Sequence, residues 1–147
     1  MDVKKFFDHI DHTLLYQFVG RRVDDQNICE LIRKIIKSFH CGIQGVGVPI
    51  GNLTSQIFAN VYLHECDLFV KHSLKITQYA RYADDCIAIF DDHSLVAPYI
   101  KAMQQFFTMN LKLEIHPRKI VVRESGQGID WLGVVLLPHY RTLRPST

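Results

Sequence analysis

The sequence predicts an α+β fold in which a small antiparallel sheet is covered by helices on one face. Two patterns predict it: apolar residues recur at helical spacing in several stretches, and two short apolar runs flank the turn Tyr82-Ala83-Asp84-Asp85. The chain has 147 residues, of which 48% are hydrophobic and 22% charged. These values are ordinary for a globular protein, so we expect one domain with a real core.

The first part of the chain is predicted to be mainly helical. Residues 1–4 resemble the end of a strand, and a helix over residues 8–19 follows from the spacing of Ile10, Leu14 and Phe18. A second helix begins at Asp24 or Asp25, which can cap it, and has a basic C-terminal end. Its apolar stripe consists of Ile28, Leu31, Ile32, Ile35 and Ile36.

Glycine-rich residues 41–51 predict a loop or distorted hairpin. Thr54 or Ser55 then caps a third helix that continues to about His72. Because this helix is apolar on more than one side, we expect its first half to be well buried.

An acidic hairpin follows, with strands over residues 76–82 and 86–90. A fourth helix begins at Asp92 or Ser94, and Pro98 in its first turn costs little. Its inward residues are expected to be Leu95, Tyr99, Met103, Phe106 and Phe107.

The last part of the chain is predicted to contain only short strands. Residues 111–115 and 120–123 are expected to be strands, and residues 128–138 a final hairpin. Helices that alternate with antiparallel hairpins in this way complete the α+β prediction.

The charge and cysteine content exclude some classes of protein. The net charge of +2 does not by itself indicate a nucleic-acid binder. The N-terminus has no apolar signal region, and the apolar runs are too short to span a bilayer. Four widely spaced cysteines are expected to be buried free thiols, which indicates a reducing, cytoplasmic location and argues against a zinc site.

Three acidic residues form a candidate metal site. Asp84 and Asp85 lie at the predicted turn, and Asp2 lies at the end of a candidate strand. If those strands are neighbours, the carboxylates converge on one edge of the sheet, where hard oxygen ligands suit Mg²⁺ or Mn²⁺. The alternative is an exposed Asp-Asp turn, because Asp is a favoured turn residue.

Five stretches in order resemble motifs of reverse transcriptases. Residues 82–85 resemble the central signature of that family, and residues 2–12 the segment that carries its first catalytic aspartate. Residues 47–60 resemble the loop and helix that hold template and nucleotide, residues 111–119 the next motif, and residues 128–133 the primer-grip hairpin.

The resemblance implies a polymerase palm with a ferredoxin-like core over residues 1–147, acting as an RNA-directed DNA polymerase, a nucleotidyltransferase. It assigns Asp2, Asp84 and Asp85 to catalysis and to two Mg²⁺ ions, or Mn²⁺, which the backbone carbonyl of Val3 would also bind.

Other roles that the resemblance implies concern substrates. Phe7 would lie under the nucleotide sugar and exclude a 2′-hydroxyl, although without the resemblance it would be expected to be a core residue beside Phe6. Lys119 would face the triphosphate, or else be a solvated lysine. The remaining expected contacts are Ile50, Gly51, Ser55 and Gln56 for nucleotide and template, and Trp131, Leu132 and Gly133 for the primer grip.

The stretch from Ile50 to Gln56 bears on the subfamily. Group II intron enzymes usually have Gln and Pro at the positions of Ile50 and Gln56. The form present here resembles reverse transcriptases of diversity-generating retroelements, which copy a template RNA with errors at adenines. Without a Gln side chain beside the nascent pair, base pairing is expected to be checked less tightly.

The resemblance also implies partners: an RNA template, a DNA or RNA primer and dNTPs. We expect a palm fragment that lacks the fingers before Asp2 and the thumb after Thr147 and therefore extends primers poorly. A basic accessory protein could supply the missing positive surface; no membrane is expected. The alternatives are an inactive palm that binds RNA or protein, and a cyclase-type palm, which nothing in the sequence supports.

Overall fold

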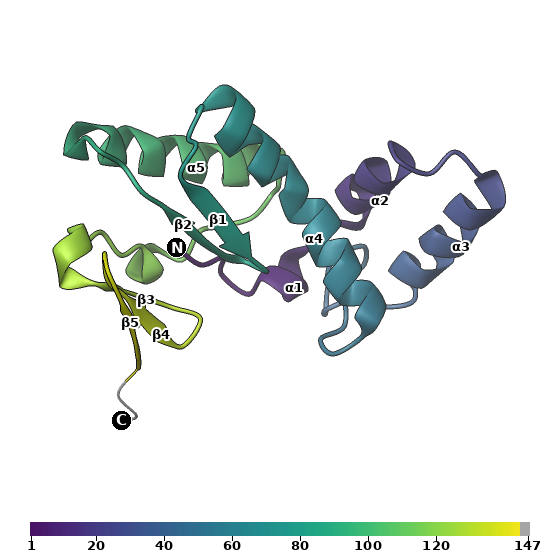
Figure 1. Cartoon of the computed structure of the whole chain (residues 1–147). Helices are drawn as coiled ribbons and strands as arrows, with labels where there is room; N and C mark the ends of the chain where they lie inside the picture. Colours follow the sequence, from purple (N-terminus) through teal and green to yellow (C-terminus); the bar gives the residue numbers. More distant parts are fainter. Residues whose placement is uncertain (145–147) are drawn as a thin grey trace.

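The computed structural model describes residues 1–144, so the last three residues of the expected domain lie outside the described part. Two long helices lie beside a hairpin, two further helices lie at the opposite end of the molecule, and a separate small sheet lies near the C-terminus (Figure 1). The elements are α1 (Phe6–His9), α2 (His12–Gly20), α3 (Gln26–Lys37), α4 (Leu53–Leu68), β1 (Tyr79–Tyr82), β2 (Asp85–Ala88), α5 (Val96–Asn110), β3 (Ile129–Trp131), β4 (Val134–Leu136) and β5 (Arg141–Leu143). This mixture of helices and small antiparallel sheets confirms the predicted fold class.

The N-terminal segment lies extended between β2 and the segment around Ile115. On one side, the N-terminal amine donates to Cys86 O at 3.0 Å, and Cys86 N donates to Met1 O at 3.0 Å. On the other side, Val3 forms an antiparallel bridge with Ile115, and His116 N donates to Asp2 O at 2.9 Å. The expected strand over residues 111–115 is therefore reduced to one bridge beside the N-terminus.

The predicted helix over residues 8–19 is wrong as a single element. The chain is extended at Ile10, and Asp11 starts the new helix α2 by accepting a hydrogen bond from Leu14 N at 2.9 Å. The glycine-rich loop causes the break, because His12 N donates to Gly45 O at 3.0 Å instead of to the preceding helical turn. A tertiary hydrogen bond here outweighs the helical periodicity.

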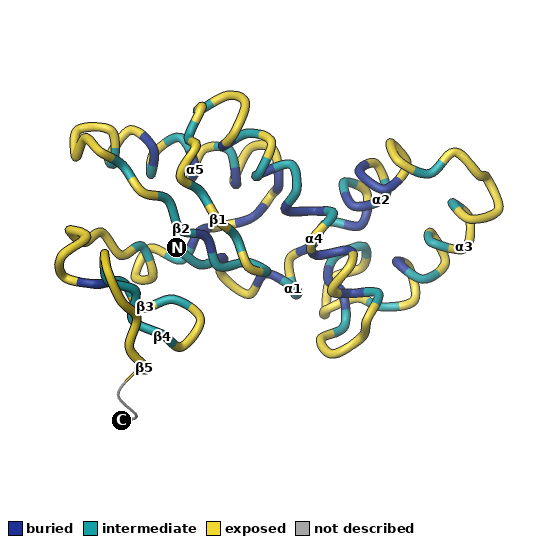
Figure 2. Tube along the Cα trace, in the orientation of Figure 1, coloured by how far each residue is buried: buried dark blue, intermediate teal, exposed yellow. Residues whose placement is uncertain are grey.

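Helix α3 begins as predicted, with Asp25 accepting from Ile28 N at 3.0 Å. Its apolar stripe, however, is only partly covered. Ile36 is buried and Ile32 and Ile35 pack at the edge of the core, whereas Ile28 and Leu31 are 49% and 57% exposed. Figure 2 shows this helix largely in the exposed colour, at one end of the molecule.

Helix α4 crosses the centre of the molecule. Its N-cap is Asn52 rather than Thr54 or Ser55, and it continues as a π-helical turn to Ser73, close to the predicted end. The expected burial of its first half holds for one face only, because Leu53 and Ile57 are exposed. The buried face carries Ser55, Phe58, Ala59, Tyr62, Leu63 and Cys66.

The acidic hairpin is confirmed, and its strands are shorter than predicted. Tyr79 pairs with Ala88 and Tyr82 with Asp85, and Ala83 in the turn has a φ of 50°. Helix α5 follows a 3₁₀ turn over His93–Leu95 that Asp92 caps. Its predicted inward residues Tyr99, Met103 and Phe107 are buried, Phe106 packs at the edge of the core, and Leu95 is exposed, contrary to expectation.

The C-terminal sheet is larger than predicted. Strands β3 and β4 form the expected hairpin, and β5 adds a third strand by pairing with β4. The exposed, polar Arg141–Leu143 carries no apolar alternation that could have predicted it. Residues 120–123 form no strand, and Val121 and Val122 are half exposed there.

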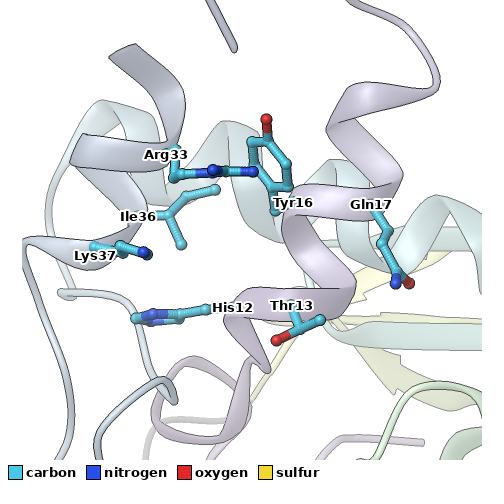
Figure 3. A pocket seen from close by; sticks show the side chains of 7 residues that line it. All are labelled: His12, Thr13, Tyr16, Gln17, Arg33, Ile36 and Lys37. Atoms are coloured by element: carbon cyan, nitrogen blue, oxygen red, sulfur yellow. The ribbon is translucent and has the colours of Figure 1, made fainter. Parts of the chain in front are cut away.

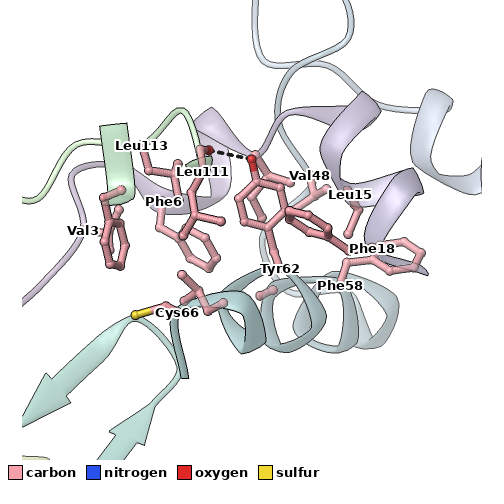
Figure 4. Packing of buried hydrophobic residues seen from close by; sticks show 14 of the residues in the cluster. Val3, Phe6, Leu15, Phe18, Val48, Phe58, Tyr62, Cys66, Leu111 and Leu113 are labelled. Atoms are coloured by element: carbon pink, nitrogen blue, oxygen red, sulfur yellow. Dashed lines mark hydrogen bonds between the residues drawn. The ribbon is translucent and has the colours of Figure 1, made fainter. Parts of the chain in front are cut away.

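One hydrophobic core joins the N-terminal segment to α2, α4, α5 and the segment around Leu111. Figure 4 shows Tyr62 in this core, with its hydroxyl donating to Leu111 O at 2.7 Å. Its ring packs edge-on against Phe18, with centroids 5.4 Å apart. The core therefore holds the N-terminal segment against the hairpin that carries the acids.

All four cysteines are free thiols, as expected. Cys66 and Cys86 are buried and Cys29 is partly buried, but Cys41 is exposed on the glycine-rich loop, which corrects the prediction for that residue. Within residues 1–144, no helix has the length and apolar character needed to cross a membrane.

Candidate active site

Two of the three predicted acids line one cavity at the edge of the hairpin. Asp2 comes from the extended N-terminal segment and Asp84 from the β1–β2 turn; the cavity has a volume of about 270 Å³. Val3, Phe7 and Lys119 also line it. Asp85 is the first residue of β2 and does not line the cavity, although its charge acts on Asp84.

The surroundings of Asp84 disfavour the charged form of its carboxyl. Burial raises the pKa of the Asp84 carboxyl, and the neighbouring carboxylates of Asp2 and Asp85 raise it further. Asp2 has a cationic partner, since Lys119 Nζ forms an ion pair with Asp2 Oδ2. That contact raises the pKa of Lys119. Lys119 is attracted by all three acids but forms its ion pair with Asp2, so a cation bound beside Asp84 would relieve the repulsion that remains there.

The donor set fits a divalent cation in its chemistry. Carboxylate oxygens are the ligands that Mg²⁺ and Mn²⁺ prefer. Three carboxylates line the cavity: Asp2 and Asp8 from the N-terminal part of the chain, and Asp84 from the hairpin turn. Among residues 1–144, no group of three or more His, Cys, Asp or Glu side chains is gathered closely enough to hold an ion as it stands.

Arg81 holds the turn that carries Asp84. Its guanidinium donates to both carboxylate oxygens of Asp67 on α4, at 2.8 and 2.7 Å, and to Ala83 O at 2.7 Å. Tyr79 OH also donates to Asp67 Oδ1, at 2.9 Å. The side chain of Arg81 is only 10% exposed, so this link is shielded from water.

Sequence reasoning missed this network. The only signals in the sequence were the position of Arg81, three residues before Asp84, and the presence of Asp67 on the helix that precedes the hairpin.

The glycine-rich loop is anchored beside the acids. Gly47 has a φ of 98°, and an added Cβ would lie 2.8 Å from Cys41 Cβ, so only glycine fits there without strain. Val48 N donates to Phe7 O at 2.9 Å, and the buried His12 ring contacts Gly47 O at 2.6 Å. His12 is a second residue that the sequence did not single out.

The predicted nucleotide and template residues are only partly brought together. Phe7 lines the cavity, and its ring meets Phe6 edge-on at 5.3 Å, so it is both a core neighbour and a cavity wall. Ile50 lines the cavity at its rim and is 77% exposed. Three others lie outside the lining: Gly51 and Gln56 are exposed, and Ser55 is buried in α4.

The predicted primer-grip residues lie in a different sheet. Trp131 ends β3, and Leu132 and Gly133 form the two-residue turn with φ values of 54° and 82°. None of them lines the acidic cavity. The indole Nε1 of Trp131 is buried without a hydrogen-bond partner among the described residues.

Acids at the edge of a small antiparallel sheet, with helices packed around it, define a polymerase palm fragment. Comparison with protein families gives the particular family. Residues 1–136 match the model of the family described as "Reverse transcriptase (RNA-dependent DNA polymerase)". The chain therefore belongs to the reverse transcriptase family, as its motifs predicted.

Several curated proteins are similar to this chain. Group II intron-encoded protein LtrA of Lactococcus lactis subsp. cremoris is 24% identical and aligns with 90% of this chain and 33% of its own length. The putative COX1/OXI3 intron 2 protein of Saccharomyces cerevisiae is 20% identical, covering 90% of this chain and 23% of its own length. Protein YkfC of Escherichia coli is 32% identical over 47% of this chain and 19% of its own length.

The chain thus spans about a third or less of the length of these relatives. Two of these relatives are named as intron proteins, which confirms the predicted resemblance to group II intron reverse transcriptases.

Proposed function

We propose that this chain is the catalytic palm of an RNA-directed DNA polymerase, in which Asp2, Asp84 and Asp85 hold two Mg²⁺ ions. The observation that carries the proposal is the meeting of Asp2 and Asp84 in one cavity, in a chain of the reverse transcriptase family. Bound ions would activate a primer 3′-hydroxyl and neutralise the leaving pyrophosphate. Mn²⁺ has the same ligand preference and could replace Mg²⁺.

The side chains around the acids would position the substrates of this reaction. The primer oxygen would form a bond to the α-phosphorus of a dNTP as the bond to pyrophosphate breaks. Phe7, in the cavity wall, would contact the sugar and reject a 2′-hydroxyl by steric clash. Lys119, freed from Asp2, would pair with phosphate oxygens.

The same proposal includes the partners. They are an RNA template near Ile50, Gly51, Ser55 and Gln56, and a DNA or RNA primer held by Trp131, Leu132 and Gly133. A basic accessory protein is a further partner. The proposed location is the cytoplasm, which the free thiols support.

The finer assignment to diversity-generating retroelements rests on Ile50 and Gln56. Ile50 is exposed at the cavity rim and its side chain carries no hydrogen-bond donor, which supports looser checking of a nascent pair there.

Metal titration tests the proposed site. We expect Mn²⁺ to bind the wild-type chain in isothermal titration calorimetry, and the Asp84→Asn variant to lose about tenfold or more in affinity, because one ligand charge is removed. Asp91→Asn is the matched control, since Asp91 is an exposed acid outside the cavity. Equal Mn²⁺ affinity in wild type and Asp84→Asn would contradict the proposal.

A second candidate is a non-catalytic palm that binds RNA or protein. The uncovered residues Ile28 and Leu31 on α3 favour it, because they offer apolar surface away from the acids. No Mn²⁺ binding at millimolar concentration would support this candidate. Primer extension on poly(rA)/oligo(dT) that Asp84→Asn abolishes would exclude it.

A further inference from the structure

A second cavity lies between α2 and α3 and shares no lining residue with the acidic one. Its volume of about 320 Å³ lies near the lower end of the roughly 300–1,000 Å³ typical of small-molecule sites. Tyr16 lines it from α2, and Arg33, Ile36 and Lys37 line it from α3 (Figure 3). Nothing in the proposed polymerase chemistry uses this cavity.

Two cationic side chains at this cavity have no acidic partner. Within residues 1–144, the side-chain ion pairs involve neither Arg33 nor Lys37. No aspartate or glutamate is among the residues that line the cavity. An anion that enters would therefore meet positive charge that the fold has not already neutralised.

The cavity also has flat and apolar walls. Arg33 Cζ lies 4.4 Å from the centroid of the Tyr16 ring, a cation–π contact that holds the guanidinium in place. Figure 3 shows Arg33 reaching across Tyr16, with Ile36 beside them. Ile36 is buried and adds an aliphatic wall. A flat ring can stack on an ordered guanidinium plane, whose N–H groups can still bind phosphate.

We propose that this cavity binds one nucleotide unit of a single-stranded nucleic acid. The phosphate would bind Arg33 and Lys37, and the base would pack against the Arg33–Tyr16 stack. Both cationic residues are exposed at the surface, so a strand can continue past the cavity on either side. The site would act as a strand contact separate from the acids, and it does not depend on the metal chemistry proposed above.

The test is fluorescence anisotropy with a short labelled oligoadenylate, RNA in one arm and DNA in the other, measured in EDTA. Lys37→Gln is expected to weaken binding about tenfold and to reduce the salt dependence of log K by about 0.7, the loss of one phosphate contact. Lys34→Gln is the matched control, because Lys34 is exposed on the same helix but does not line the cavity. Its affinity should stay within about twofold of wild type.

A second variant tests the stacking wall. Tyr16→Leu is expected to weaken oligoadenylate binding about fivefold or more, because it removes the ring that orders Arg33. Equal losses in Lys37→Gln and Lys34→Gln, or no loss in Lys37→Gln, would overturn the proposal. Binding of free adenosine monophosphate but not of the oligonucleotide would overturn the strand assignment.

The two proposals can fail separately. Lys37→Gln should keep wild-type Mn²⁺ affinity, and Asp84→Asn should keep wild-type oligonucleotide affinity in EDTA. A chain that binds Mn²⁺ at Asp84 but shows no dependence on Lys37 would retain the polymerase proposal and reject this one.

Discussion

Lys119 and Asp2 form an ion pair at the place where we propose that metal binds. An incoming divalent ion would have to displace the ammonium group of Lys119. Until the lysine moves, its charge would repel the ion. Among residues 1–144, Asp84 forms no ion pair, and burial and its acidic neighbours raise its pKa. At the scale of single residues, a metal ion at this site would compete with Lys119 for Asp2, in a cavity that Lys5 also lines.

Removing the ammonium group of Lys119 should favour the binding of a metal ion. We expect Lys119→Met to raise Mn²⁺ affinity about threefold to tenfold, because a like charge leaves the cavity. Isothermal titration calorimetry measures this, with Arg118→Met as control, since Arg118 is exposed and lies outside the cavity. An unchanged or lower affinity in Lys119→Met would show that the lysine does not compete with metal.

Arg81 is a positioning residue, because it holds the acidic turn without lining the cavity. Arg81→Lys keeps the charge but cannot span both oxygens of Asp67 and Ala83 O together. We expect it to lower the free energy of unfolding by about 1–3 kcal/mol and to weaken Mn²⁺ binding. Arg123→Lys is the exposed control. If Arg81→Lys lost stability but kept its Mn²⁺ affinity, Arg81 would have a structural role only.

At the scale of elements, aspartate N-caps decide where two helices begin. Asp11 caps α2 and also pairs with Lys112 at 2.7 Å, whereas Asp25 caps α3 without an ion pair among the described residues. Burial alone would raise the pKa of Asp11, but hydrogen bonds from Lys112 and from Leu14 N outweigh it and lower the pKa. The two helices therefore offer a comparison of a cap with and without an added charge pair.

Asp11→Ala is expected to lower the free energy of unfolding by about 1–2 kcal/mol near neutral pH. Because the folded pKa lies below the ordinary value of 3.8, the stabilisation is present above that value. It is lost as pH falls through the folded pKa. The difference from wild type should therefore shrink below about pH 4.

Urea denaturation at several pH values measures this effect. Asp25→Ala should cost less, about 0.5–1 kcal/mol, since only a cap is lost. A deficit in Asp11→Ala that is as large in acid as at neutral pH would contradict the assigned role of the carboxylate.

At the scale of the whole molecule, Tyr62 joins elements that are far apart in the sequence. It is fully buried, packs on Phe18 and donates to the backbone of Leu111. Tyr62→Phe keeps the ring but leaves a buried carbonyl unpaired, so we expect a loss of about 1–3 kcal/mol in the free energy of unfolding. Tyr140→Phe is the control, because Tyr140 is exposed. Equal thermal stability of the two variants would contradict this role.

The sequence predicted some elements of this fold correctly. The acidic hairpin, the Asp25 cap and the β3–β4 hairpin follow from patterns within about ten neighbouring residues. The break at Ile10, the absence of a strand over residues 120–123 and the added strand β5 could not be predicted that way. The break at Ile10 depends on a hydrogen bond to the distant Gly45, whereas β5 pairs with the nearby β4 without an apolar alternation to mark it.

By itself, the sequence determined the family, the order of the acidic motifs and the residue types that suit a metal site. Only the tertiary structure decided which groups meet. Met1 bonds to Cys86 across 85 positions, and Lys119 reaches Asp2 across 117. The Arg81 network and the cavity between α2 and α3 also depend on how helices pack. The physical reason is that local patterns encode local structure, whereas an active site is assembled from contacts between segments distant in the chain.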